Sequence, residues 1–342
     1  FNEVADQLAA STTFKNIAWM NGGLEVWQRG TSVAVTAATT PYTADRWYIL
    51  TNANQVSTVA RQTGLTDQSQ FCARVQRDSA QTGIGIMQFA FPLDTDEVYR
   101  LRGKFAYLSF RIRAGANWSP ASGNISISLI YGTGAAAKNS AFVGTTSAIA
   151  QTVVLTTTTQ LVQVISSAII PVTALQAEIN FAWTPVGTAG TNDYFEIDDV
   201  ELVAVPVTVA ADYIPDGFEY LPFGQMLEGC KSHYQKTYRY GTAPTLGSLD
   251  FVTPLLTLSQ AAEQVGLFWV YDNELRSNAS PDATFHGIGT ATSSNWLGLN
   301  VSASYAAVSS VSVGHKGLLV RSASVSAAGV WFAIHALVSA GI

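Results

Sequence analysis

Residues 104–113 read KFAYLSFRIR, and this stretch decides the fold class of the chain. Positions 106, 108, 110 and 112 carry Ala, Leu, Phe and Ile, whereas the positions between them carry mostly polar or amphipathic side chains. Successive side chains of a β-strand point to opposite faces, so this period of two predicts a half-buried strand. The same alternation recurs in 125–131, and no helical periodicity of similar strength occurs from 17 to 205. This part of the chain is therefore predicted to be a β-sandwich.

Further strand-like stretches, each bounded by turn residues, extend the interpretation across the first 205 residues. They are 46–51, 71–77, 85–91, 124–131, 160–167, 177–184 and 194–203. Residues 132–146 and 186–192 are rich in Gly, Ala and Thr, so we expect them to form loops.

The composition limits the classes of partner. Only 12% of the 342 residues are charged, against about 25% in an average soluble domain. Either other subunits cover much of the surface, which favours a homo-oligomer, or Thr and Ser solvate it. The net charge is −6 and no Lys/Arg cluster occurs, so nucleic acid is not an expected partner. No run of about 18 apolar residues is present, so we expect no membrane insertion.

Two short motifs stand near the ends of this predicted sandwich. Residues 21–25 read NGGLE, and residues 194–202 read YFEIDDVEL. They resemble the opening Asn-x-Gly-Phe-Glu and closing Ile-Asp-Asp-Val-x-Leu signatures of carbohydrate-binding modules with a jelly-roll fold. The resemblance covers about half of the chain, and Leu24 stands where that family usually has an aromatic residue. It implies that the first and last strands of the sandwich lie side by side.

The same resemblance implies a structural calcium ion at the paired ends. Glu25 and Asp198 are then its side-chain ligands, helped by backbone carbonyl oxygens. Asp198 and Asp199 are adjacent in a strand and are expected on opposite faces, so that one is buried while the other is solvated. A buried Asp198 satisfied by Arg46 or by backbone N–H groups is an equally good interpretation.

Aromatic side chains offer faces on which sugar rings can stack. Trp27, Trp47 and Trp183 lie in strand-like runs and are expected in the core. Trp118 lies in the loop sequence GANWSP, between two predicted strands, and is expected to be exposed. Trp118 is therefore the candidate ligand-binding residue.

Residues 212–225 read DYIPDGFEYLPFGQ and separate the two β-rich parts of the chain. Pro222 cannot donate to a sheet and Gly224 tolerates a tight turn, so residues 218–224 are predicted to be a hinge. Apolar or aromatic residues follow at 227, 230, 234 and 238, which predicts a helix over 225–238 with one buried face. We expect that face to pack between the two modules or against a neighbouring subunit.

The hinge also resembles a segment of bacteriophage tail-fibre and minor virion proteins. In those proteins a carbohydrate-module-like domain is followed by a Phe-Glu-x-x-Pro-[Tyr/Phe]-Gly turn and a Leu-x-x-Cys-x-x-Tyr-Tyr helix. This chain has His233-Tyr234 where two aromatic residues are usual. The resemblance implies a virion location and contacts with other virion proteins. It further implies assembly, usually as a trimer, or recognition of a host-surface glycan.

Residues 241–342 return to strand-like patterning. The predicted strands are 266–271, 283–287, 296–303, 306–313, 316–322 and 330–337. The last of them reads VWFAIHAL and is apolar at nearly every position, so it is expected to be buried on both faces or paired with another subunit.

Signatures of catalysis are scarce in the chain. The four histidines show no metal-type spacing, and the two cysteines, Cys72 and Cys230, are expected to be buried thiols. Asp94, Asp96 and Glu97 form a compact acidic group that could supply a pair of glycosidase carboxylates. An acidic turn before a strand explains them better, so we expect a protein without enzymatic activity.

Together these observations predict an all-β chain with four parts. They are an N-terminal arm (1–16), a carbohydrate-module-like jelly-roll sandwich (17–206), a hinge with a short linking helix (207–240) and a C-terminal antiparallel β domain (241–342) that is a candidate for trimerisation or for the tip. The favoured function is a structural virion protein, such as a tail fibre, head fibre or spike, with host-glycan attachment. The alternative is a secreted, non-catalytic carbohydrate-binding protein or an accessory module of a polysaccharide-degrading enzyme.

Overall fold

The computed structural model places the chain in two compact units, Phe1–Val26 with Ser32–Met226 and Ile342, and Trp27–Thr31 with Leu227–Gly341. The structure describes residues 15–52, 54–135, 137–138, 142–208, 210, 213, 217–244, 256–257, 266–272, 275, 282–287, 295–298, 305–313, 316–322 and 331–339. The predicted arm, 1–16, lies almost wholly outside the described residues. No helix in the described part of the chain is long and apolar enough to cross a membrane.

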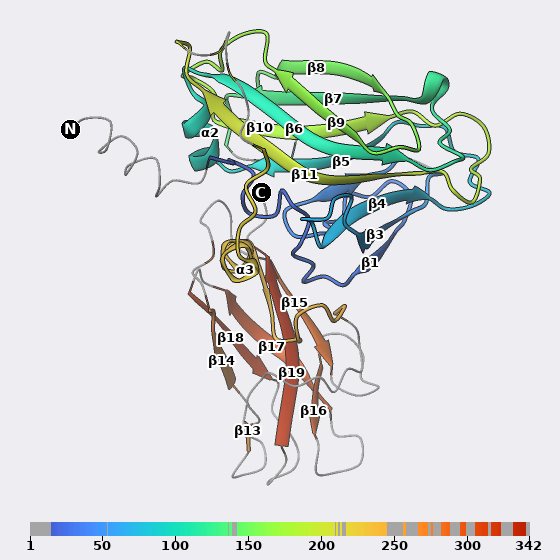
Figure 1. The fold of residues 1–342 in the computed structure, drawn as a ribbon. Helices are drawn as coiled ribbons and strands as arrows, with labels where there is room; N and C mark the ends of the chain where they lie inside the picture. The colour runs from blue at the N-terminus through green and yellow to red at the C-terminus, as the bar shows by residue number, and fades with distance from the viewer. Residues whose placement is uncertain are drawn as a thin grey trace. The chain divides into compact units, whose positions relative to one another are not determined.

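The first unit is a sandwich of two antiparallel sheets, which Figure 1 shows as two layers of strands. One sheet has the order β1 (Ser32–Val35), β3 (Ser57–Thr63), β4 (Phe71–Arg77), β11 (Tyr194–Val205), β6 (Phe105–Ala114) and β9 (Gln160–Ile165). The other has the order β2 (Tyr48–Leu50), β5 (Met87–Leu93), β10 (Gln176–Trp183), β7 (Asn124–Gly132) and β8 (Thr146–Val154). The predicted all-β, jelly-roll-like fold class is confirmed.

Aromatic side chains from both sheets form the core between them. Phe110 of β6 meets Phe181 of β10 edge-on, with ring centroids 4.9 Å apart. Phe195 of β11 meets Trp183 of β10 in the same way at 5.1 Å. Such pairs add about 0.5–1.5 kcal/mol to the free energy gained by burying apolar area. The predicted burial of Trp27, Trp47 and Trp183 is confirmed, because none is more than 3% exposed.

Three strands of the sandwich were not expected from the sequence, namely β1, β3 and β8. β1 and β8 are the outermost strands of their sheets, and β3 lies next to β1. Most β8 side chains remain exposed, in the sequence TSAIAQTVV. An edge strand with little buried surface has no strict apolar alternation, so its pairing partner rather than its own pattern defines it.

The acidic group at 94–97 opens a helix rather than a turn before a strand, so that expectation was wrong. Helix α2 (Thr95–Leu101) follows Asp94, whose backbone N–H donates to Glu97 Oε2 over 2.7 Å. Arg46 forms ion pairs with Asp94 at 2.9 Å and Glu97 at 2.8 Å, and all three side chains are at most 5% exposed. Two of the three acids are thus buried against one guanidinium, and Asp96 points to solvent.

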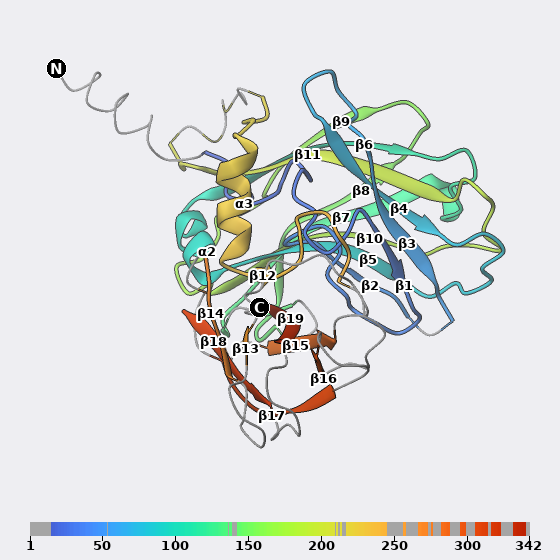
Figure 2. The same ribbon diagram turned by 90° about the horizontal axis from the view of Figure 1, so that it is seen from below.

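The predicted linking helix exists but is shorter than expected. Helix α3 spans Phe223–Lys231 (Figure 2), a turn follows, and Tyr234 already belongs to a strand. Cys230, Tyr234 and Tyr238 are buried, as their spacing predicted, but a helix to residue 238 was wrong. The strand forms because Tyr234 pairs with Ser339, about a hundred residues further along the chain, and local spacing carries no sign of such a partner.

The second unit contains one antiparallel sheet with the path β12-β19-β16-β17-β18-β14, and β13 and β15 also pair with β19. Its strands are β12 (Tyr234–Lys236), β13 (Leu256–Thr257), β14 (Gly266–Val270), β15 (Asp282–Gly287), β16 (Asn295–Gly298), β17 (Tyr305–Val313), β18 (Gly317–Ser322) and β19 (Trp331–Ser339). The apolar last strand, β19, therefore has pairing partners within its own chain, and Ala336 and Val338 are buried.

Candidate functional site

The two signature motifs meet at one end of the sandwich. The backbone N–H of Ile17 donates to Leu202 O over 2.7 Å, and that of Val200 donates to Gly22 O over 3.0 Å. The approach is so close that a Cβ on Gly22 would lie 2.2 Å from Val200 O, which explains the glycine. The two motif segments therefore lie side by side. The implied pairing of the first and last strands was wrong, because β1 pairs with β3 at the sheet edge whereas β11 lies between β4 and β6.

A β-bulge distorts β11 at the Ile-Asp-Asp-Val signature. The register between β11 and β6 shifts between Asp198 and Glu201, and Asp199 adopts a φ of 50°. An extra residue of this kind breaks the alternation of faces. Both Asp198 and Asp199 are consequently buried, at 0% and 3% exposure, instead of one being solvated.

Asp198 is held by the loop between β3 and β4. Its Oδ2 accepts the Leu65 N–H over 2.9 Å, and its Oδ1 accepts the Asp199 N–H over 2.8 Å. Burial raises the pKa of Asp198 to about 7 and the charge of Asp199 adds to the shift, whereas the hydrogen bonds from Ser69 and Leu65 oppose it. A buried Asp198 was expected to be satisfied either by Arg46 or by backbone N–H groups. The backbone N–H groups are its partners, because Arg46 forms its ion pair with Asp94 instead.

Glu25 binds the other side of the same loop. Its Oε1 accepts the backbone N–H groups of Gln70 over 3.0 Å and Phe71 over 3.3 Å. Burial raises the pKa of Glu25, the two backbone hydrogen bonds lower it, and the nearby charge of Asp199 raises it further. Glu25 and Asp198 thus clamp one loop from the two signature motifs.

Asp199 completes this carboxylate cluster, defined here as Glu25, Asp198 and Asp199. Its Oδ2 accepts the Tyr220 hydroxyl over 2.7 Å and lies 3.4 Å from Arg111 Nε. Its Oδ1 is buried and has no hydrogen-bond partner among the residues that the structure describes. Burial raises the pKa of Asp199, against the opposing effect of Tyr220 and Arg111.

The cluster fits the predicted calcium ion only in part. Calcium takes six to eight oxygen ligands, and no group of three or more His, Cys, Asp or Glu residues suited to a metal occurs in the described ranges. Both oxygens of Asp198 already accept hydrogen bonds, whereas Asp199 Oδ1 has none. Asp199 with Glu25 would therefore hold the ion better than Asp198 would. Calcium remains a prediction, in which backbone carbonyl oxygens would complete the ligand set.

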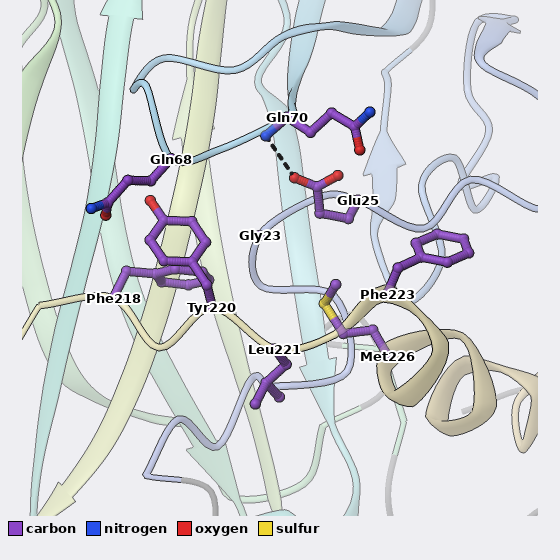
Figure 3. Close-up of a pocket in the computed structure, with 9 residues that line it drawn as sticks. All are labelled: Gly23, Glu25, Gln68, Gln70, Phe218, Tyr220, Leu221, Phe223 and Met226. Carbon is purple, nitrogen blue, oxygen red and sulfur yellow. Dashed lines mark hydrogen bonds between the residues drawn. The ribbon is translucent and has the colours of Figure 1, made fainter.

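A pocket of about 210 Å³ adjoins the cluster within the first unit. Figure 3 shows Glu25 and Gln70 on one wall, with the aromatic rings of the hinge around them. The lining residues are Gly23, Glu25, Gln68, Gln70, Phe218, Tyr220, Leu221, Phe223 and Met226. The pocket thus brings together the opening signature, the β3–β4 loop and the hinge.

Trp118 lies apart from this pocket and is half-buried rather than exposed, so the expected exposure was wrong. Its ring packs edge-on against Phe195 at 5.7 Å and lies 6.1 Å from Trp183, and its Nε1 donates to Gly123 O. Loop position alone favoured exposure, but the loop folds back over the core. Its role in ligand binding remains a prediction.

Several residues of the site were not predicted. Asp199 and Tyr220 lie within the quoted motifs. Their part in the site follows only from the β-bulge at Asp199 and from the hydrogen bond between the two side chains. Gln68 and Gln70 lie in a loop whose Gly64 and Ser69 signal a turn without indicating what the loop contacts.

No protein-family model matches the chain, and no curated protein matches it. Among solved structures, the enzymatically active domain of tailspike protein 4 of bacteriophage CBA120 is 14% identical with a TM-score of 0.32, and the match covers 47% of this chain and 19% of that one. A CBM4 structure is 21% identical with a TM-score of 0.33, covering 54% and 97% of the two chains. A CBM22-1 xylan-binding domain from Paenibacillus barcinonensis is 12% identical with a TM-score of 0.32, covering 51% and 99%.

Proposed function

We propose that this chain is a non-catalytic structural protein of a bacteriophage virion, a tail fibre, head fibre or spike, which assembles as a homotrimer and attaches to a host-surface glycan. One observation carries the proposal. The hinge, whose sequence resembles virion proteins, is folded onto both signatures that resemble carbohydrate-binding modules. Tyr220 binds Asp199 of the closing signature, and the ring of Phe218 lies 3.3 Å from where a Cβ on Gly23 would be.

The hinge is thereby part of the sandwich unit, which extends to Met226. The carboxylate of Glu219 also accepts the backbone N–H groups of Lys15 over 3.0 Å and Asn16 over 3.3 Å. A linker that only joined two modules would need none of these contacts. Their presence supports a sandwich that is built together with its hinge, as the virion resemblance implies.

The lack of catalysis is supported by the state of the compact acidic group. Asp94 and Glu97 are buried against Arg46, so neither carboxylate reaches a substrate.

The second candidate function is a secreted carbohydrate-binding protein. It is favoured because the sandwich is complete and both signature motifs lie side by side in it. The two functions differ in the expected assembly.

Light scattering of the full chain separates them. The virion function predicts a mass of three times the 36.4 kDa of one chain, independent of dilution over the measured range. A mass equal to one chain would overturn the trimer and leave the secreted binding protein as the better proposal.

A further inference from the structure

The pocket beside the carboxylate cluster has the chemistry of a sugar subsite. Three aromatic side chains of the hinge line it, and two of them are well exposed, Tyr220 at 40% and Phe223 at 43%. Aromatic rings left exposed on a rigid frame offer apolar faces to a ligand. The axial C–H groups of a pyranose ring suit such a face.

Two of the three rings are held in place by contacts within the protein. The rings of Phe218 and Tyr220 meet edge-on at 4.8 Å, and the Tyr220 hydroxyl bonds to Asp199 Oδ2 and lies 3.3 Å from Thr66 Oγ1. Phe223 stands on the first turn of α3, across the pocket from Tyr220 (Figure 3). A preformed arrangement lowers the entropy cost of binding.

The polar groups of the pocket are suited to hydroxyls. Within the described part of the chain, the side-chain amides of Gln68 and Gln70 make no hydrogen bond to protein, and both residues are exposed. Each amide can donate and accept. Glu25 is oriented by two backbone donors on its Oε1, so its carboxylate faces the pocket in a defined position.

Charge and size narrow the class of ligand. The described lining contains one carboxylate and no Lys, Arg or His. Asp199 adds negative charge near Glu25, and Arg61 and Arg111 lie nearby outside the lining. Without a bound cation, an anionic sugar would meet the like charge of Glu25 inside the pocket, which disfavours it. A volume of about 210 Å³ is below the range of about 300–1,000 Å³ typical of pockets for drug-sized ligands.

We propose that this pocket binds one uncharged hexopyranose unit. The sugar ring lies between the hinge aromatics, and the sugar hydroxyls form hydrogen bonds with Glu25, Gln68 and Gln70. The proposal rests on the proposed glycan attachment and assigns it a site. That site lies at the hinge end of the sandwich, away from Trp118.

Saturation-transfer NMR on the full chain tests the assignment. The probes are glucose, galactose and N-acetylglucosamine, with glucuronate as the charged analogue. At least one neutral sugar should give a signal, and glucuronate should compete at least about tenfold more weakly. The variant Phe223→Ala should weaken binding about tenfold, since it removes one ring face, and Gln68→Ala should weaken it about threefold.

Tyr99→Ala is the matched control, because Tyr99 is an aromatic residue of the same unit that is 54% exposed outside the pocket. Thermal unfolding of each variant confirms that it is folded. Binding that survives both Phe223→Ala and Gln68→Ala would overturn this site but leave glycan attachment intact. No signal from any neutral sugar would overturn the site, while the trimer mass would still test the virion role separately.

Discussion

Among the buried and half-buried carboxylates of the described sandwich, two groups are stabilised by different partners. Asp94 and Glu97 share Arg46, a guanidinium whose side chain is only 1% exposed. Glu25, Asp198 and Asp199 have instead backbone donors, the Tyr220 hydroxyl and an ion pair to Arg111, whose side chain is 37% exposed. The first group is a closed contact with a buried cation, whereas the second borders a pocket and its ion pair is to a partly exposed cation.

The difference shows why an acidic pair in sequence is a poor guide to function. Asp94, Asp96 and Glu97 look like a catalytic group but serve to begin a helix and anchor it to Arg46. Adjacent strand positions predicted that only one of Asp198 and Asp199 is buried, yet a bulge buries both. A buried charge is costly unless paired, so the local count of partners decides which group is structural.

The largest effect is expected from removing the shared cation. Arg46→Met leaves Asp94 and Glu97 buried without a partner, and this should cost about 3–5 kcal/mol in the free energy of unfolding. Arg111→Met, the matched change at the other cluster, should cost about 1 kcal/mol or less because that ion pair is half-exposed. Urea unfolding measures both. Equal losses of unfolding free energy in the two variants would mean that both groups of carboxylates depend equally on their arginine.

A somewhat smaller effect is expected from pH. Well below pH 4, Asp198 is protonated in both the folded and the unfolded state and does not lower the free energy of unfolding. As pH rises, the unfolded state loses its proton first, because the folded pKa is about 7 against an ordinary value of 3.8. Stability should therefore fall between pH 4 and 7 by up to about 4 kcal/mol, and then level off.

Urea unfolding of the wild type and of Asp198→Asn across pH 4 to 8 isolates this contribution. Between pH 4 and 7 the wild type should lose unfolding free energy relative to Asp198→Asn. Above pH 7 the difference between the two proteins should be constant. A difference that does not depend on pH would show that Asp198 is charged in the folded protein throughout.

The smallest of the three effects concerns calcium. A bound ion would supply the missing positive charge, so calcium should raise the melting temperature relative to EDTA, by the equivalent of about 2.7 kcal/mol at a hundredfold excess over Kd. Glu25→Gln and Asp199→Asn should abolish the rise. Asp67→Asn, which alters an exposed acid in the same loop, should not. No rise in the wild type would refute the calcium prediction.

Much of the fold could be predicted because a half-buried strand has apolar and polar residues at alternating positions in the sequence. The alternation in 104–113 corresponds to β6, and 71–77 coincides with β4. The edge strands β1 and β8 bury too little to carry that record. The end of α3 was misplaced because Tyr234 leaves the helix to pair with Ser339.

The candidate site was predictable only as far as its motifs. Glu25 and Asp198 were identified by resemblance, and both do hold the loop between β3 and β4. Asp199 and Tyr220 could not be connected from the sequence, since they lie on different segments and meet through a bulge with a positive φ. Trp118 was expected at the surface, but its contacts with Phe195 and Trp183 depend on how a loop folds over the core.

By itself, the sequence determined the all-β class, the strands that carry the core, and the motifs at the paired ends and the hinge. These follow from side-chain periodicity and from residues with special backbone limits, which act over a few positions. Only the tertiary structure decided which carboxylates lack a buried cation and which aromatic rings border a pocket. Those properties depend on burial and on partners far apart in the chain, and no local pattern records them.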